Sequence, residues 1–318
     1  MRKTKVSYII PCYNEADNIR PLVSEILNYH PDRYQLEIIF INDGSTDATF
    51  ENIYTATLTY DFIKYINFSK NFGHQFALKA GIDASTGDCV IMMDADLQHP
   101  PQIIPQLLEK WEQKFDIVQA IRKDATSTSW FKKWSSRRFY MLLNRVSDLQ
   151  LNPGSSDFRL IDKKIADIIR NSFNESFLFL RGVFNWLGFK RIEIEYVANS
   201  RFSGKSKYSL KKMIVFAIDG LMSFTTRPLR LATYLGAIIF FFSFIYLMYI
   251  LYSFLFTNQN ITGWTSIMVS ILFLGSIQLI FIGLLGEYIG KIFMITKNRP
   301  LYIVKDTNLT STEMMNQK

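Results

Sequence analysis

Cysteine is scarce in this chain: only Cys12 and Cys89 occur among 318 residues. Both stand beside short apolar runs with β-strand character, so we expect two small buried side chains and no disulfide. A secretory leader is not expected either, because Pro11 interrupts the apolar run after the basic N-terminus and leaves it too short for a signal-peptide core. The large N-terminal part of the chain is therefore predicted to be cytoplasmic.

Charge is absent from two long stretches near the C-terminus. Leu231 to Phe256 is 26 residues without a charged side chain, and Trp264 to Gly286 is another 23. At a rise of about 1.5 Å per residue, each helix would cross the roughly 30 Å of a bilayer's hydrocarbon. A buried core helix usually keeps a polar face, so a hairpin of two transmembrane helices is the better interpretation.

The basic residues around these stretches predict their orientation. The loop Thr257 to Gly263 carries no charge, whereas Lys and Arg are frequent before the first span and after the second. Short loops rich in Lys and Arg stay in the cytoplasm, so both flanks and both termini are expected there, with the protein in the inner (plasma) membrane. The expected divisions are a catalytic domain over 1–207, an amphipathic juxtamembrane helix over 208–228, transmembrane helices over 229–257 and 264–290, and a cytoplasmic tail over 291–318.

The net charge of +8 by itself could suggest a nucleic-acid partner, but the positions of the basic residues favour lipid. Basic residues concentrate beside the expected membrane segments, where they would attract anionic or phosphorylated lipid. The stretch from Tyr208 to Phe224 has the pattern of an interfacial helix, although an ordinary packed helix is an alternative. The final dozen residues have the composition of a disordered polar tail.

Strand and helix periods alternate through the first 120 residues, which predicts an α/β fold with a mostly parallel sheet. Helices are expected between the strands and again over Trp130 to Val146. In such sheets ligands bind beyond the carboxyl ends of the strands. The expected strands are Val6–Ile10, Leu36–Ile41, Ile63–Phe68, Val90–Met93 and Ile117–Ala120, and the expected helices between them are Asp17–Asn28, Ala48–Tyr60, His74–Ala84 and Pro101–Lys114.

Two carboxylates, Asp94 and Asp96, directly follow the fourth expected strand. Such a pair is costly to bury unless a cation lies between them, and hard oxygen ligands suit Mg²⁺ or Mn²⁺. A D-x-D pattern alone could be a solvated loop, and its position after a strand gives it weight. His74 and His99 flank this site without zinc-like spacing, so His74 is expected to contact a polar group or phosphate and neither is expected to bind the metal.

Asp43 follows the second expected strand within Asn42-Asp43-Gly44-Ser45-Thr46-Asp47. Asn-Asp-Gly-Ser is also ordinary turn chemistry, and Thr46 or Asp47 could cap the next helix. The functional interpretation is that Asp43 accepts a hydrogen bond from a nucleotide base or ribose. Both roles can hold together.

The polar motifs taken in order resemble family 2 glycosyltransferases of the Rossmann-like GT-A fold. Within that family they are most similar to the dolichol-phosphate mannosyltransferase group and its bacterial members that glycosylate undecaprenyl phosphate. The resemblance covers nearly the whole chain, to about Val304. It rests on Ile10-Pro11-Cys12-Tyr13-Asn14-Glu15, Asn42 to Asp47, Asn71-Phe72-Gly73-His74-Gln75, Asp94-Ala95-Asp96-Leu97-Gln98-His99-Pro100, Asp157-Phe158-Arg159-Leu160, Leu180-Arg181-Gly182, Arg201 to Tyr208 and the two apolar stretches.

The resemblance implies roles for individual residues. The Gln-x-x-Arg-Trp motif of processive polysaccharide synthases is absent, which favours a single transfer. Metal binding is assigned to Asp94 and Asp96. The residues implied to border the nucleotide sugar are Pro11, Tyr13, Glu15, Asp43, Asp94 and Gln98, the last against the metal or the diphosphate.

Asp157 and Asp96 are the expected catalytic residues. In relatives with hydroxyl acceptors an aspartate near position 157 would be a base. A lipid phosphate with a second pKa of about 6 hardly needs one, so Asp157 could instead hold a sugar hydroxyl, orient Arg159, or form a purely structural ion pair. A phosphate acceptor requires cations, although any one of them could be a solvated surface charge. The candidates are Arg122, Arg137, Arg138, Arg201, Lys205 and Lys207.

The expected function is transfer of one glucose from UDP-glucose onto undecaprenyl phosphate at the cytoplasmic membrane face. Mg²⁺ or Mn²⁺ would stabilise negative charge on the leaving diphosphate, and the resemblance implies inversion at the anomeric carbon. Alternatives are another donor (UDP-N-acetylglucosamine or GDP-mannose), another acceptor, or a non-enzymatic transporter of lipid-linked sugars. The transporter alternative is disfavoured, because two uncharged spans make a poor conduit for a polar headgroup. The protein is expected to form a homo-oligomer.

Overall fold

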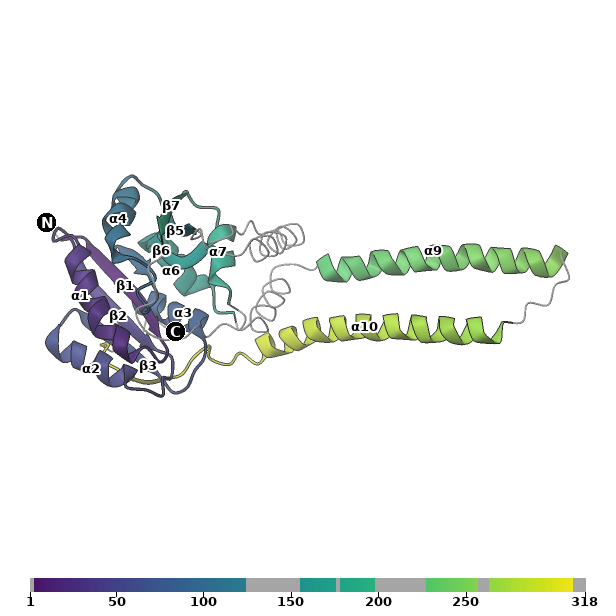
Figure 1. Cartoon of the computed structure of the whole chain (residues 1–318), viewed down its shortest axis with the longest axis horizontal. Helices are drawn as coiled ribbons and strands as arrows, with labels where there is room; N and C mark the ends of the chain where they lie inside the picture. The colour runs from purple at the N-terminus through teal and green to yellow at the C-terminus, as the bar shows by residue number, and fades with distance from the viewer. Residues whose placement is uncertain (1–2, 124–154, 176–177, 198–226, 257–262, 311–318) are drawn as a thin grey trace. The chain divides into compact units, whose positions relative to one another are not determined.

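The computed structural model describes residues 3–123, 155–175, 178–197, 227–256 and 263–310. These residues form two compact units. The first contains the described residues up to Val197 together with those from Arg299 onward, and the second contains the described part of 227–298. Figure 1 shows both units in the colours of the chain.

An eight-stranded mixed sheet forms the centre of the first unit, in the order β7-β5-β6-β4-β1-β2-β3-β8. Strands β4, β1, β2 and β3 run parallel, β6 runs antiparallel between β4 and β5, and β8 runs antiparallel to β3. β7 is parallel to β5. The strands are β1 (Lys5–Cys12), β2 (Gln35–Asn42), β3 (Ile63–Phe68), β4 (Cys89–Met92), β5 (Ile117–Lys123), β6 (Ser155–Asp162), β7 (Arg191–Val197) and β8 (Val304–Thr307).

Helices cover both faces of this sheet, so its central strands are continuous apolar runs. One face, with Tyr8 and Phe40, packs against α1, α2 and α4. On the other face α3 lies so close to β1 that a Cβ on Gly81 would be 2.2 Å from Ile9 Cγ2. The helices are η1 (Ala16–Asn18), α1 (Ile19–Tyr29), α2 (Thr49–Thr59), α3 (His74–Ala84), η2 (Pro101–Ile103), α4 (Ile104–Glu112), α6 (Lys163–Ser172) and α7 (Leu180–Trp186).

The expected strands and helices of the first 120 residues are confirmed, with small shifts at their ends. Strands β6 and β7 and helices α6 and α7 were not predicted as elements, although Asp157 and Arg181 within them belong to recognised motifs. The antiparallel insertion of β6 makes the sheet mixed. The helices expected over 130–146 and 208–224 lie outside the described residues.

The second unit contains two long helices, α9 (Arg227–Phe256) and α10 (Trp264–Thr296). Among the described residues, one segment is long and apolar enough to cross a membrane, Phe273–Thr296, and Ala232–Tyr246 is a shorter apolar helical segment. α10 continues six residues beyond the expected boundary at 290.

The chain after α10 returns to the first unit, so the prediction of a disordered tail is wrong for residues 307–310. β8 pairs with β3, the Ser69 N–H donates to the Ile303 carbonyl at 3.0 Å, and the Leu309 side chain is buried. The Tyr302 ring stacks on Phe68 with centroids 4.9 Å apart. β3 would otherwise be an edge strand with unpaired backbone N–H and C=O groups, and β8 pairs with them. The polar composition of the C-terminal segment does not indicate this pairing.

Tyr302 is expected to contribute measurably to the stability of the first unit. Its hydroxyl lies 3.2 Å from Asp83 Oδ2, and Asp83 also pairs with buried Lys79 at 2.6 Å. Tyr302→Phe, which removes one hydrogen bond, should cost about 1 kcal/mol of unfolding free energy. Tyr302→Ala, which also removes the ring, should lower the unfolding free energy by up to about 3 kcal/mol. That value is the lower limit of the usual range for truncating a buried aromatic side chain to alanine.

Urea unfolding of the full chain in detergent measures the unfolding free energy of both variants and of the native protein. Tyr54→Ala is the control, because Tyr54 is an exposed tyrosine of α2. Equal stability of Tyr302→Ala and the native protein would contradict the packing described for the C-terminal segment.

Candidate active site

The loops after β1 and β2 are joined to each other at the carboxyl edge of the sheet. Asn14, with φ of 54°, accepts the Thr46 N–H through Oδ1 at 2.8 Å, and its own N–H donates to Ser45 Oγ at 3.0 Å. Residues expected to border the nucleotide are distributed along this edge. Pro11 is buried within β1, Tyr13 is 37 % exposed, and Glu15 accepts a hydrogen bond from Asn18 Nδ2 at 2.5 Å.

Asp43 connects the β2 loop to the loop between β3 and α3. Its buried carboxylate accepts the N–H groups of Phe72 at 2.7 Å and of Gly73 at 3.0 Å. Burial raises the pKa of Asp43, and these N–H donors oppose that rise. Gly44 (φ +67°) allows the contact, because a Cβ there would lie 2.3 Å from the Lys70 carbonyl carbon. The structure thus assigns Asp43 a loop-fixing role; the predicted contact with a nucleotide stays a prediction.

The loop after β4 carries the D-x-D pair. Asp96 Oδ1 accepts the Gln98 N–H at 3.1 Å across a turn whose central residue, Leu97, has φ of 59°. The Asp94 N–H donates to His99 Nδ1 at 2.9 Å. Asp94 therefore projects from a loop that is closed by its own hydrogen bonds.

A divalent cation fits the oxygen atoms of this loop. Asp94 Oδ1 is buried and accepts no hydrogen bond from the described residues, although its side chain as a whole is 37 % exposed. Within the described ranges no three His, Cys, Asp or Glu side chains gather as a metal site. A cation held by Asp94 and Asp96 would thus take further ligands from substrate and water, as Mg²⁺ and Mn²⁺ commonly do.

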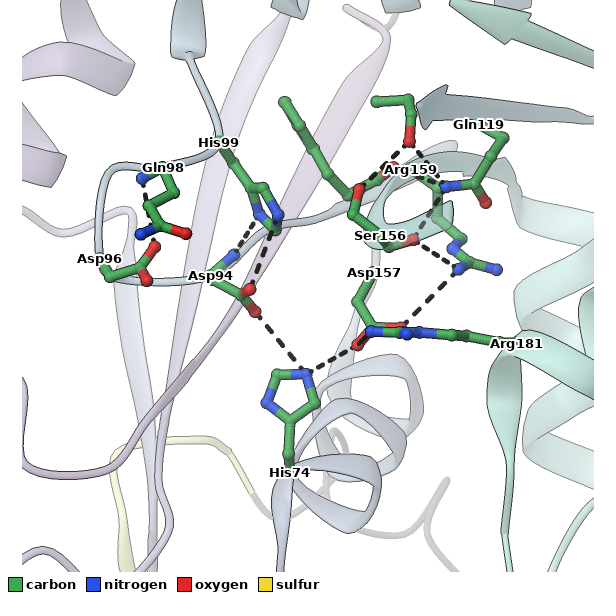
Figure 2. A network of polar contacts seen from close by, with 12 residues as sticks. His74, Asp94, Asp96, Gln98, His99, Gln119, Ser156, Asp157, Arg159 and Arg181 are labelled. Carbon is green, nitrogen blue, oxygen red and sulfur yellow. Dashed lines mark hydrogen bonds and ion pairs between the residues drawn. The ribbon is translucent and has the colours of Figure 1, made fainter. Parts of the chain in front are cut away.

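Asp157 is the centre of a second polar cluster, shown in Figure 2. Arg181 of α7 binds both of its oxygens, from Nε to Oδ1 and from Nη2 to Oδ2, each at 2.8 Å. Burial opposes the charge, but Arg181 and His74 outweigh it and hold the pKa of Asp157 well below its usual range. A carboxylate paired in this way is a weak proton acceptor and a firmly oriented hydrogen-bond acceptor.

Arg159, the partner expected for Asp157, is farther away than Arg181. Its Nη2 lies 3.7 Å from Asp157 Oδ1 and donates to the Ser156 carbonyl at 2.9 Å. The guanidinium covers the Phe184 ring at 4.4 Å, and burial lowers the pKa of Arg159 to about 10 despite Asp157. Arg181 was not assigned a role from sequence, although the Leu180-Arg181-Gly182 motif pointed to it.

His74 connects the two acidic groups. It is the first residue of α3, and its Nε2 lies 3.2 Å from Asp157 Oδ2 and 3.6 Å from Asp94 Oδ1. Burial lowers the pKa of His74, but the hydrogen bond to Asp157 and the charges of both carboxylates more than compensate and raise it. Asp94 and Asp157, 63 residues apart in sequence, thus belong to one polar network (Figure 2).

Only one of the predicted acceptor-phosphate residues belongs to the described part of the chain. Arg122 is exposed near the end of β5, opposite Tyr196 in β7. The other candidates, Arg137, Arg138, Arg201, Lys205 and Lys207, lie outside the described residues.

Comparison with known proteins agrees with this arrangement. A sequence profile described as glycosyl transferase family 2 matches residues 7–169, and one described as GtrB C-terminal hairpin matches residues 227–292. A Bacillus subtilis protein named as an uncharacterized glycosyltransferase is 39% identical over 96% of this chain and 94% of its own length. A bactoprenol glucosyl transferase of Shigella phage SfX is 38% identical over 95% of this chain and 99% of its own.

A solved structure supports the fold. Mannosyl-3-phosphoglycerate synthase from Rubrobacter xylanophilus has a TM-score of 0.50 and 13% identity, covering 74% of this chain and 75% of that one. The mixed α/β sheet, the acidic site beyond its strands and the relatives together define a glycosyltransferase. The chain belongs to glycosyl transferase family 2, so the predicted family is confirmed.

Proposed function

We propose that this enzyme transfers one glucose from UDP-glucose onto undecaprenyl phosphate at the cytoplasmic face of the inner membrane, with inversion. The observation that carries the acceptor is similarity over nearly the full length of both chains to proteins named bactoprenol glucosyl transferase, at 38% identity. Glucose as the sugar rests on those names, and a nucleoside diphosphate as its carrier rests on the acidic loop after β4. Absence of the Gln-x-x-Arg-Trp motif favours transfer of a single sugar.

Asp94 and Asp96 are the residues that would hold Mg²⁺ or Mn²⁺. The cation, when bound, would stabilise negative charge on the departing nucleoside diphosphate. The buried Oδ1 of Asp94, which accepts no hydrogen bond from the described residues, supports this assignment. Gln98, Tyr13 and Glu15 are proposed to contact the nucleotide sugar.

Asp157 would position a sugar hydroxyl or the acceptor. Its bidentate bond to Arg181 and its lowered pKa argue against proton abstraction, and a phosphate dianion needs no base. Arg122 and the predicted cations beyond the described residues would bind the acceptor phosphate. In this scheme Asp94 and Asp96 would bind the donor through the metal, and the cations would bind the acceptor phosphate.

Both helices of the second unit are proposed to span the membrane as a hairpin. α9 has 30 residues and α10 has 33, and the profile that matches them is itself described as a hairpin. The uncharged loop between them and the basic flanks support a cytoplasmic site with both termini on the same side. A homo-oligomer remains a prediction.

Labelled nucleotide sugars offered to the purified protein with Mn²⁺ and undecaprenyl phosphate test the proposal. UDP-glucose should label the lipid, and GDP-mannose and UDP-N-acetylglucosamine should label it much less. Undecaprenol, which lacks the phosphate, is the matched acceptor control and should stay unlabelled. Label from a different donor would change the sugar assignment, and no labelled lipid with any donor would overturn the acceptor.

A further inference from the structure

His99 is a buried side chain whose two ring nitrogens both face Asp94. Nδ1 accepts the Asp94 N–H at 2.9 Å, and Nε2 lies 3.6 Å from Asp94 Oδ2. A backbone N–H can only donate, so Nδ1 is the acceptor and the ring proton is on Nε2. The two contacts of the ring with Asp94, one to its backbone and one near its carboxylate, are drawn in Figure 2.

Aromatic packing fixes the plane of this ring. His99 stacks on Phe158 with centroids 4.9 Å apart and an interplanar angle of 19°. Tyr196 meets it edge-on at 6.1 Å. Because β6 carries Phe158 and β7 carries Tyr196, the imidazole is held by the sheet, and it in turn holds a residue of the loop after β4.

We propose that His99 is a positioning residue that fixes the backbone and the carboxylate of Asp94 for the divalent cation. This inference rests on the proposed function, in which Asp94 binds that cation. Its Nδ1 closes the loop from Asp94 to residue 99 by a hydrogen bond, and this bond carries the positioning, because Nε2 lies 3.6 Å from Oδ2, beyond hydrogen-bond distance. The opposite oxygen, Oδ1, is buried and accepts no hydrogen bond from the described residues, with His74 Nε2 at 3.6 Å, so its lone pairs remain available to a metal ion.

Substitutions can separate the two nitrogens from the ring packing. His99→Phe keeps an aromatic ring against Phe158 but removes both nitrogens. His99→Asn restores an acceptor close to the position of Nδ1, and His99→Gln restores a polar group nearer to Nε2. Loss of polar partners behind metal ligands commonly weakens metal binding about 10- to 100-fold, which is the effect expected for His99→Phe.

Mn²⁺ binding to the purified full-length protein, measured by electron paramagnetic resonance with and without UDP, tests the proposal without relying on turnover. His99→Phe should weaken binding about 10- to 100-fold, and His99→Asn should recover most of it. His30→Phe is the matched control, because His30 bonds Tyr8 at 3.0 Å through Nδ1 at a different position in the same unit. It should bind Mn²⁺ as the native protein does.

The outcomes separate this inference from the proposed function. Native affinity in His99→Phe, or binding by His99→Asn as weak as that of His99→Phe, would overturn the positioning role while leaving the metal site intact. Failure of the native protein itself to bind Mn²⁺ with UDP would instead overturn the proposed metal site. Thermal unfolding without metal identifies a variant that has lost its fold, and His99→Asn then carries the test.

Discussion

Asp94→Ala is expected to lower sugar transfer at least about 10³-fold, because several kcal/mol of leaving-group stabilisation would be lost with the cation. The same variant should lose Mn²⁺ binding. Asp94 has a buried oxygen that accepts no hydrogen bond from the described residues, and it contacts both His99 and His74. The measurements are transfer of labelled sugar to lipid and Mn²⁺ binding by electron paramagnetic resonance.

Two further variants control this result. Asp94→Asn keeps the size of the side chain and removes its charge, so it should behave nearly as Asp94→Ala does. Asp61→Ala removes an exposed aspartate from the loop that enters β3, at the opposite edge of the sheet, and should leave activity unchanged. Substantial transfer by Asp94→Ala, or undiminished transfer in chelator, would mean that the loop after β4 is only a turn.

Arg181→Ala is expected to destabilise the first unit and to lower kcat about 100-fold. Asp157 would remain buried without its bidentate partner, which costs about 3–5 kcal/mol for a buried pair. The lower end is expected here, because His74 and Arg159 still neighbour the carboxylate. Displacement of an oriented group by about 1 Å can reduce a rate by about 10²-fold.

A second substitution distinguishes an unpaired charge from lost packing. Arg181→Ala combined with Asp157→Asn removes both charges and should recover much of the stability while activity stays low. Arg191→Ala is the control, since Arg191 is an exposed arginine bonded to Asn185, and it should change stability by less than about 0.5 kcal/mol. Native stability of Arg181→Ala would contradict the pairing in Figure 2.

The arrangement of the sheet was partly visible from the sequence. Short apolar runs ending in polar residues located β1 to β5, because strands covered on both faces must be apolar throughout. β6 and β7 were missed as strands. β7 alternates exposed and half-buried positions with glutamates, which leaves a weak apolar signal. β8 is stabilised by its pairing with β3, and such non-local partners cannot be found from local composition.

The sequence by itself determined the family, the α/β class and the candidate residues of the D-x-D loop, because strand periodicity and contiguous motifs are local properties. Tertiary structure decided which residues pair. Arg181 lies 24 positions from Asp157 in sequence, and His74 lies 83, yet both bind its carboxylate. The Asp94 site shows the same division: two aspartates separated by one residue indicated a metal, whereas only the fold brought His74, 20 positions earlier in the sequence, to within 3.6 Å of Asp94 Oδ1. Side-chain partners across loops depend on how strands are ordered in the sheet, and spacing along the chain does not encode that order.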